Sequence, residues 1–209
     1  MEKTVYIVRH GETDYNRNGI VQGQGVDTSL NDTGRLQAKA FYEHYHQSGF
    51  EVVLTSQLRR THETMAPFIK DGLPWEQFPE INEINWGKHE GKKSTPDMHL
   101  QYKSMMEAWE AGELDARLEG AESANDLGQR LSAFVYALSQ RPEERILVCS
   151  HGRAMRALMC LLQEQSLTRM NDYKHSNTGL YKAAYQNRQY QFLLKNDLTH
   201  LDQLKIKIG

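Results

Sequence analysis

Two short apolar runs that lie far apart in the chain each end in a histidine followed by a glycine, with an arginine beside them. The runs and the residues that follow them are Val5–Val8 with Arg9, His10 and Gly11, and Ile146–Cys149 with Ser150, His151, Gly152 and Arg153. Continuous apolar runs of this length are typical of strands that are buried on both faces of a parallel sheet. Ligands of open α/β sheets bind at the carboxyl ends of such strands. The runs therefore predict an α/β fold in which both histidines line one pocket, and the arginines suit a polyanion.

Helical and strand patterns alternate along the rest of the chain. A further strand is predicted over 51–55 and a hairpin over 179–194, with apolar side chains at helical spacing between the strands. One predicted helix has an apolar face of Leu36, Ala40 and Phe41, and another begins after Ser123, a favourable N-cap residue. This alternation predicts an α/β three-layer sandwich, in which a mostly parallel mixed sheet has helices on both faces.

The segment at about 84–122 has a weaker pattern, in which glycine, charged and aromatic residues mix around one short predicted helix, Leu100–Trp109. We interpret this segment as a small helical lid insertion over the site. A chain of 209 residues is long enough for one full hydrophobic core. We therefore expect a single domain over residues 1–209, with the lid as its insertion.

Composition narrows the class of protein. The chain is 39% hydrophobic and 25% charged, as in ordinary globular proteins, and its net charge of −2 argues against nucleic acid as a partner. Neither a signal peptide nor an apolar stretch long enough to span a membrane is predicted, so we expect a cytoplasmic protein without a membrane partner. Cys149 and Cys160 fall in apolar patterns and are interpreted as buried thiols. A homodimer is one option for the assembly.

His10 has the features of a nucleophile toward phosphorus. A neutral imidazole can attack when one ring nitrogen is unprotonated and the other donates a hydrogen bond that fixes the tautomer. Arg9 would disfavour the imidazolium form, and arginine side chains would bind the equatorial oxygens of the transferred group. Arg59 and Arg60 follow the strand predicted over 51–55, and only one of them can point into the pocket. The pattern thus predicts phosphoryl transfer to His10.

The departing oxygen also needs a proton donor. Glu83 lies between Ile81 and Ile84, a setting that suits this role. On local sequence alone its rivals are Glu80, Glu90 and Glu122. His151 is expected to hydrogen-bond an equatorial oxygen and so stabilise the transition state. The histidines do not show the spacing of HExxH or zinc-finger sites, so we expect no metal and no cofactor.

Together these motifs resemble those of the histidine phosphatase superfamily, in its phosphoglycerate mutase-like group, over nearly the whole chain. The segments that carry the resemblance are Val8–Asn16, Gln22-Gly23, Asp27–Gly34, Ser56–Thr64, Glu83–Gly91, Gly120–Ser123, Ser150–Gly152 and Asn196–Leu201. The resemblance implies that His10 is the nucleophile and Glu83 the proton donor. It also implies that the catalytic arginine is Arg60 rather than Arg59.

Further binding residues are implied by the same resemblance. Arg9 and His151 would hold the phosphoryl group, and Asn16 would contact it. Other substrate-binding residues are expected at Gln22, Gly23, Gly152 and His89. The family commonly has a tryptophan before its Glu-Gly pair, whereas Lys88 and His89 stand there in this chain. His89 either faces the substrate or caps a turn at the surface.

The resemblance covers both phosphatases and mutases. Cofactor-dependent mutases of this group usually carry an arginine directly after the glutamate and a longer lid, whereas Ile84 follows Glu83 here. We therefore predict a metal-independent phosphomonoesterase that acts through a phosphohistidine on a small phosphorylated metabolite. The alternatives are a cofactor-dependent phosphoglycerate mutase and a non-catalytic module that binds a phosphorylated metabolite.

Overall fold

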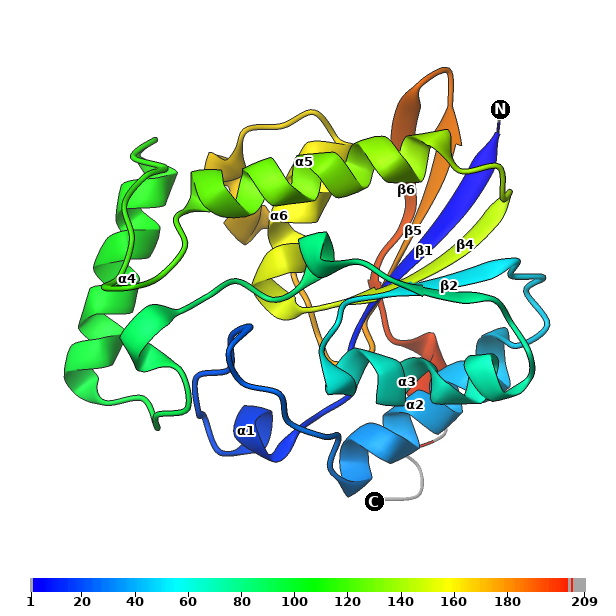
Figure 1. Cartoon of the computed structure of the whole chain (residues 1–209), viewed down its shortest axis with the longest axis horizontal. Coiled ribbons are helices and arrows are strands. Elements are labelled where there is room, and N and C mark those ends of the chain that lie inside the picture. The colour runs from blue at the N-terminus through cyan, green and yellow to red at the C-terminus, as the bar shows by residue number, and fades with distance from the viewer. Residues whose placement is uncertain (1, 203, 205–209) are drawn as a thin grey trace.

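The computed structural model describes residues 2–202 and 204 and contains a six-stranded mixed sheet (Figure 1). The strands are β1 (Lys3–Arg9), β2 (Val52–Thr55), β3 (Trp75–Gln77), β4 (Arg145–Ser150), β5 (Leu180–Gln186) and β6 (Gln189–Asp197). They lie in the order β3-β2-β4-β1-β5-β6, and the first four pair in parallel. β5 is antiparallel to β1, and β6 is antiparallel to β5. The predicted mostly parallel mixed sheet is confirmed.

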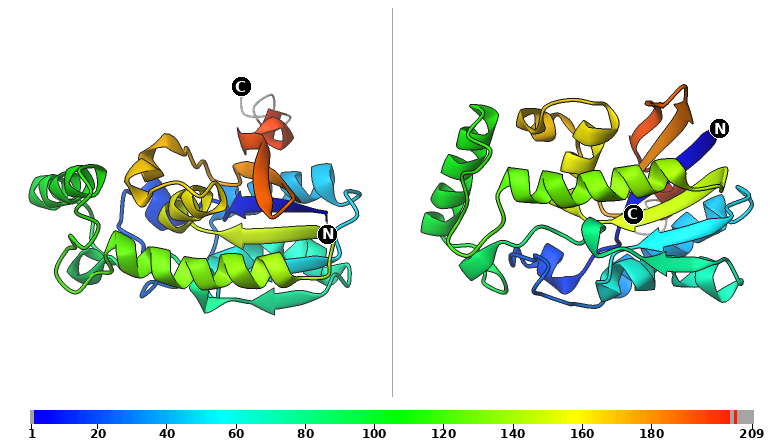
Figure 2. Two further views of the ribbon diagram at one scale, coloured as in Figure 1. Left: turned by 90° about the horizontal axis from the view of Figure 1, so that it is seen from above. Right: turned by 45° about the horizontal axis from the view of Figure 1, so that its top comes forward.

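Helices cover both faces of this sheet. The helices are α1 (Asp14–Arg17), α2 (Asp32–Tyr45), α3 (Arg59–Lys70), α4 (Pro96–Glu110), α5 (Ala124–Gln140) and α6 (Gly152–Leu162). Short 3-10 segments are η1 (Pro79–Ile81), η2 (Gly87–His89), η3 (Leu167–Asp172) and η4 (Thr199–Leu201). α2 and α3 lie on one side of the sheet, and α5 and α6 lie on the other (Figures 1 and 2). The three-layer sandwich is thus confirmed.

Alternate residues of β1 enter the two apolar layers. Tyr6 and Val8 pack in the cluster that contains Phe41 of α2, whereas Val5 and Ile7 pack in the cluster that contains Leu131 of α5. Because successive side chains of a strand point to opposite faces, a strand between two helical layers must be apolar at nearly every position. This explains the continuous apolar run that precedes Arg9.

The register of β1 and β4 brings the two histidine–glycine pairs to one edge of the sheet. Val8 pairs with Cys149, and Arg9 pairs with Ser150. His10 and His151 are the next residues of two adjacent parallel strands, so they leave the sheet side by side. The prediction that both histidines lie at one strand edge is confirmed.

Two details of the predicted elements were wrong. The edge strand β3 was not predicted, because it has only three residues and all three are exposed. The predicted apolar face of α2 was also displaced, since Leu36 is 49% exposed and the buried residues of the helix are Gly34, Ala38, Phe41 and Tyr45. The first inward-facing residue of the helix is Gly34, which packs closely against the backbone of Glu12. A prediction based on large apolar side chains does not identify such a position.

The C-terminal hairpin follows its prediction. Its turn consists of Asn187 and Arg188, which adopt φ angles of 52° and 65° between β5 and β6. Two-residue turns with positive φ at both positions match the twist of the flanking strands. Because β5 pairs with β1, the segment before β5 is delivered to the same edge of the sheet as Arg9.

The segment at 84–122 holds η2 and α4, which extends the predicted helix at both ends. α4 begins after its N-cap Thr95, whose side chain accepts a hydrogen bond from the Met98 N–H group. Its buried side chains Met105, Met106 and Trp109 belong to the same apolar cluster as α5 and α6. In Figure 1, α4 lies at the end of the molecule away from the hairpin. A lid function for this segment stays a prediction.

None of the described helices is long and apolar enough to span a membrane. The expected cytoplasmic location, the homodimer and the single-domain organisation stay predictions.

Candidate active site

His10 leaves β1 with its ring in a defined tautomer. Its Nδ1 atom lies 2.7 Å from the carbonyl oxygen of Gly11, which can only accept a hydrogen bond. Nδ1 therefore carries the proton, and Nε2 is left with a lone pair. A Cβ atom at Gly11 would lie 2.6 Å from the carbonyl oxygen of Gly34, so only glycine fits here. The Gly11 N–H group also donates to Thr64 Oγ1 at 3.0 Å.

The ring of His10 is neutral near pH 7. Burial has the largest effect, followed by the guanidinium groups of Arg60 and Arg9, and together they lower the pKa of His10 well below its ordinary value of 6.5. The sequence-based explanation named the cations alone, whereas the structure gives burial the larger part. Both causes disfavour the charged form.

Arg60 is the buried member of the arginine pair at the start of α3. Its exposed fraction is 0%, whereas Arg59 is exposed. Its Nη1 donates to the Val26 carbonyl at 2.7 Å and its Nη2 to the Gly23 carbonyl at 3.2 Å. Burial lowers the pKa of Arg60 to about 10, so the side chain remains a cation near pH 7. Arg60, and not Arg59, is therefore the buried arginine beside His10, and its catalytic role stays a prediction.

Arg9 is the second cation beside His10. Its Nη1 donates to the His175 carbonyl at 3.3 Å, and its Nε is buried without a partner among the described residues. The negative charge of Glu83 partly offsets the effect of burial on the pKa of both Arg9 and Arg60. These three side chains are thus within electrostatic reach of one another.

Glu83 is held at the N-terminus of α6. Its Oε1 accepts hydrogen bonds from the Ala154 N–H group at 2.9 Å and from its neighbour Ile84 at 3.0 Å, and its Oε2 accepts one from the Arg153 N–H group at 3.1 Å. The first N–H groups of a helix lack partners within the helix and favour a carboxylate at this place. Glu83 is 7% exposed, and its carboxyl group is oriented by backbone N–H groups rather than by another side chain.

Two of the three rival glutamates, Glu122 and Glu90, have other partners, whereas Glu80 Oε2 is buried without a hydrogen-bond partner among the described residues. Glu122 pairs with Arg130 at 2.8 Å, and Arg130 in turn donates to the carbonyl groups of Glu80, Asn82 and Glu83. Glu90 accepts hydrogen bonds from the Trp86 and Gly25 N–H groups. Arg130 and Glu122 therefore shape the loop that carries Glu83.

His151 lies against His10, with their ring centroids 5.2 Å apart. Its Nδ1 accepts a hydrogen bond from Arg60 Nε at 3.1 Å, so its proton is on Nε2, which lies 2.8 Å from Ser56 Oγ. Burial, Arg60 and His10 lower the pKa of His151 well below its ordinary value. Both ring nitrogens have protein partners here, so the predicted bond to a phosphoryl oxygen requires one of these contacts to be exchanged.

The other predicted binding residues lie in two places. Asn16 Oδ1 accepts a hydrogen bond from Asn177 Nδ2, which also donates to the His10 carbonyl. The Gly23 carbonyl contacts Arg60, as described above. Gly152 is the first residue of α6, and a Cβ atom there would lie 2.9 Å from the His175 ring. These three residues therefore contact the same groups that surround His10.

Gln22 and His89 line a separate cavity of about 250 Å³ between α4 and the loop that follows α1. Its other lining residues are Val21, Trp86, Ser94, Met98, His99, Tyr102 and Leu118. His89 Nε2 also lies 3.0 Å from Gln101 Oε1 of α4. His89 thus faces a cavity and also joins η2 to α4, and among the described residues it makes no hydrogen bond to His10.

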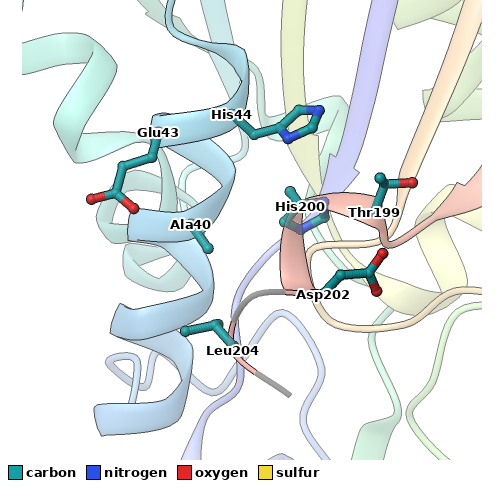
Figure 3. Close-up of a pocket in the computed structure, with 7 residues that line it drawn as sticks. All are labelled: Ala40, Glu43, His44, Thr199, His200, Asp202 and Leu204. Atoms are coloured by element: carbon teal, nitrogen blue, oxygen red, sulfur yellow. The ribbon is translucent and has the colours of Figure 1, made fainter. Parts of the chain in front are cut away.

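A second cavity, of about 370 Å³, lies between α2 and η4 (Figure 3). Its lining residues are Ala40, Glu43, His44, Thr199, His200, Asp202 and Leu204, all drawn in Figure 3. None of the predicted catalytic residues lines it. We therefore do not place it in the candidate active site.

Two residues of the site were missed from the sequence. His175 and Asn177 lie in the loop before β5, and the Thr178 N–H group of this loop donates to the Arg9 carbonyl. The one sequence feature that pointed to these residues was the polar run 174–179, which directly precedes the predicted hairpin. That signal becomes informative only once β5 is known to pair with β1, where Leu180 faces Val8.

The buried neutral histidines predict a loss of stability in acid. Burial is the main cause that lowers the pKa of His175 to about 3 and that of His200 to about 4. In the unfolded chain these groups titrate near pH 6.5, so below that pH the unfolded state binds more protons than the folded state. Each such histidine lowers the free energy of unfolding by up to about 1.4 kcal/mol per pH unit between its two pKa values.

Urea unfolding at pH 7, 6 and 5 measures this effect. We expect the midpoint to fall as the pH decreases from 6.5 toward 4, with a shallower fall in the His200→Gln variant. Carboxyl groups with a lowered pKa, such as Asp197, act in the same direction only below about pH 4. Equal midpoints at pH 7 and pH 5 would contradict the prediction.

Comparison with known proteins supplies the family. The chain matches the Histidine phosphatase superfamily (branch 1) over residues 5–198. “Putative phosphoserine phosphatase 2” of Hydrogenobacter thermophilus is 26% identical over 204 residues, which cover 97% of this chain and 99% of that protein. “Probable phosphoglycerate mutase GpmB” of Yersinia pestis is 31% identical over 209 residues, which cover 95% of this chain and 94% of that protein.

A solved structure agrees at the level of the fold. Mycobacterial glucosyl-3-phosphoglycerate phosphatase in complex with VO3 has a TM-score of 0.81 and 22% identity to this chain, and the match covers 94% of this chain and 100% of that one. The family match spans nearly the whole chain. The chain therefore belongs to the histidine phosphatase superfamily, branch 1.

Proposed function

We propose that this protein is a metal-independent phosphomonoester hydrolase that acts through a phosphohistidine on a small phosphorylated metabolite. The observation that carries the proposal is the tautomer of His10, whose Nδ1 faces the Gly11 carbonyl and leaves Nε2 unprotonated. Arg9 and Arg60 supply two cations beside this ring. A neutral nucleophile next to fixed positive charge suits attack on a phosphoryl dianion.

In the first step, the Nε2 lone pair of His10 forms a bond to phosphorus while the bond from phosphorus to the ester oxygen breaks. A protonated Glu83 carboxyl group gives its proton to the departing oxygen, which leaves as an alcohol. The charge on the equatorial oxygens is stabilised by Arg9 and Arg60. The Nδ1–H bond to the Gly11 carbonyl stabilises the positive charge that the ring acquires.

In the second step, water attacks the phosphohistidine. Glu83, now a carboxylate, takes a proton from that water, and the electron pair of the bond from phosphorus to nitrogen returns to His10. Inorganic phosphate leaves, and both residues regain their starting protonation. The backbone hydrogen bonds from Arg153 and Ala154 keep the Glu83 carboxyl group in one orientation through both steps.

Hydrolysis is favoured over mutase chemistry by the residue after Glu83. Ile84 stands there instead of the arginine that the mutases of this group usually carry. The relatives named above include a protein named as a phosphoserine phosphatase and one named as a phosphoglycerate mutase, so the names of relatives cover both reactions. Both names point to a small phosphorylated metabolite as the class of substrate for this chain.

A phosphate-release screen in EDTA tests the proposal. Sugar phosphates, phosphoglycerates, phosphoamino acids and nucleotides are offered to the purified protein, and we expect release from at least one class without added metal. Activity that appears only after a metal is restored would contradict the metal-independent mechanism. If no compound releases phosphate, isomerisation of phosphoglycerate with bisphosphoglycerate present would favour the mutase. Failure of both assays would favour the non-catalytic binding module.

A further inference from the structure

Two more arginines gather at the first turns of α6, next to the groups that surround His10. Arg153 is 7% exposed and donates from Nη1 to Asn171 Oδ1 at 3.2 Å. Arg156 donates from Nη1 to the same oxygen at 2.9 Å. Both guanidinium groups therefore donate to the same uncharged amide oxygen. This oxygen accepts hydrogen bonds but neutralises neither of the two positive charges.

Four arginines in this region have no carboxylate partner. Within residues 2–202 and 204, no ion pair is formed by Arg9, Arg60, Arg153 or Arg156. Elsewhere, the arginines that do form ion pairs are Arg17, Arg35, Arg117, Arg130, Arg141 and Arg169. Arg60 and Arg153 are buried, and Arg9 and Arg156 are partly buried. Buried charge without a partner is costly, and a fold that keeps these cations together is organised to receive an anion.

Three buried nitrogen atoms in this cluster of arginines have no hydrogen-bond partner in the described part of the chain. They are Arg9 Nε, Arg156 Nε and His175 Nδ1. Arg9, Arg156 and Arg153 are all close enough to His175 to help lower its pKa. His175 is thus the link between the cations beside His10 and those of α6. A buried donor without a partner destabilises the fold unless a ligand supplies the missing hydrogen bond.

The charges exceed what one phosphoryl group can neutralise. The four guanidinium groups carry four positive charges while Glu83 is protonated, as the proposed first step requires, and three net charges once Glu83 is a carboxylate. The neighbouring histidines add no charge near pH 7, because the pKa of each is lowered. A phosphomonoester dianion would neutralise two of them. The remaining charge calls for one more anionic group on the same substrate.

We propose that Arg153, Arg156 and His175 form a second anion subsite, and that the substrate is a phosphomonoester whose alcohol part carries a further carboxylate or phosphate. This rests on the proposed function, because the reacting phosphoryl group must lie at His10. Recognition is by charge-assisted hydrogen bonds from the guanidinium groups, with His175 Nδ1 at the boundary between the two subsites.

The lid segment holds this subsite in place. Tyr102 of α4 accepts a hydrogen bond from Arg153 Nη2 through its hydroxyl group. The Arg153 guanidinium carbon also lies 5.9 Å from the ring centroids of Tyr102 and Trp109. Tyr102 also lines the 250 Å³ cavity that contains Gln22 and His89, so this cavity and the subsite have one side chain in common. α4 thus positions Arg153 for the second anion.

Matched pairs of esters test the subsite. 3-Phosphoglycerate is compared with glycerol 3-phosphate, which lacks the carboxylate, and fructose 1,6-bisphosphate is compared with fructose 6-phosphate. We expect the wild type to favour the more anionic member of at least one pair by tenfold or more in kcat/KM. The pair that shows the preference distinguishes a carboxylate from a phosphate. In Arg156→Gln this preference should fall at least fivefold.

Controls separate the subsite from general effects. Arg169→Gln removes an exposed guanidinium group from the neighbouring η3 and should keep the preference of the wild type. Arg156→Lys should keep part of it, and His175→Asn supplies a second loss-of-contact variant if Arg156→Gln does not fold. Equal use of both members of each pair by the wild type, or an unchanged preference in the folded variants, would overturn the subsite. Absence of all phosphate release would overturn the proposed function instead.

Discussion

Replacing His10 with alanine is expected to reduce phosphate release by at least about 10⁴-fold, because removal of a catalytic nucleophile costs losses of this order in other covalent enzymes. The variant loses the nitrogen that forms the phosphoenzyme in the proposed mechanism, while Arg9 and Arg60 remain to bind the substrate. KM should therefore change far less than kcat. The measurement is steady-state phosphate release with the best ester from the screen.

The control for this variant is His44→Ala, which removes an exposed histidine of α2 and should keep full activity. A rapid acid-free quench with a ³²P-labelled ester should trap label on the wild type and none on His10→Ala. Retention of more than a few per cent of the wild-type kcat by a folded His10→Ala protein would mean that water attacks the ester directly. The covalent mechanism would then be abandoned.

Strand direction made the centre of the site predictable from the sequence. The apolar runs of β1 and β4 identify strands buried on both faces, and buried strands of this kind are parallel. Parallel neighbours end at the same edge, so His10 and His151 had to meet wherever the helices lay. The observed register, in which Arg9 faces Ser150, is the simplest form of that expectation.

Residues whose place depends on helix phase or on an edge of the sheet were harder to predict. Arg59 and Arg60 are adjacent and have identical side chains, so the residues alone could not show which one is buried. The resemblance to the family assigned the catalytic arginine to Arg60. Leu36 was assigned to the wrong face, because Gly34 approaches the Glu12 backbone and makes a small residue the inward one. β3 lies at an exposed edge, where an apolar pattern is not required.

His175 was missed for a different reason. It has no motif of its own, and it reaches the site only because β5 runs antiparallel to β1 and begins opposite Val8. The register of a long-range antiparallel pair is not encoded in the local sequence of either strand. Glu83 is an intermediate case, since its neighbours suggested burial, whereas its orientation depends on the N–H groups of α6.

Replacing Glu83 with glutamine is expected to produce a loss that depends on the leaving group. An alkyl ester such as glycerol 3-phosphate needs a proton on its departing oxygen, so its kcat/KM should fall by about 10²–10⁴-fold. p-Nitrophenyl phosphate releases a stable phenolate without a proton, so its kcat/KM should fall by less than about tenfold if general-acid catalysis is what Glu83 supplies. The comparison uses kcat/KM, which reports on the steps up to formation of the phosphohistidine.

Glu119→Gln is the matched control, because it alters an exposed glutamate of the same 84–122 segment and should leave both esters unaffected. Equal losses for the two esters in Glu83→Gln would indicate that Glu83 orients the substrate and does not donate the proton. The distinction matters for the backbone bonds described above. A carboxyl group held by the N–H groups of Arg153 and Ala154 can act as a donor only if its remaining lone pairs take up a proton, and the leaving-group series measures whether that proton reaches the departing oxygen.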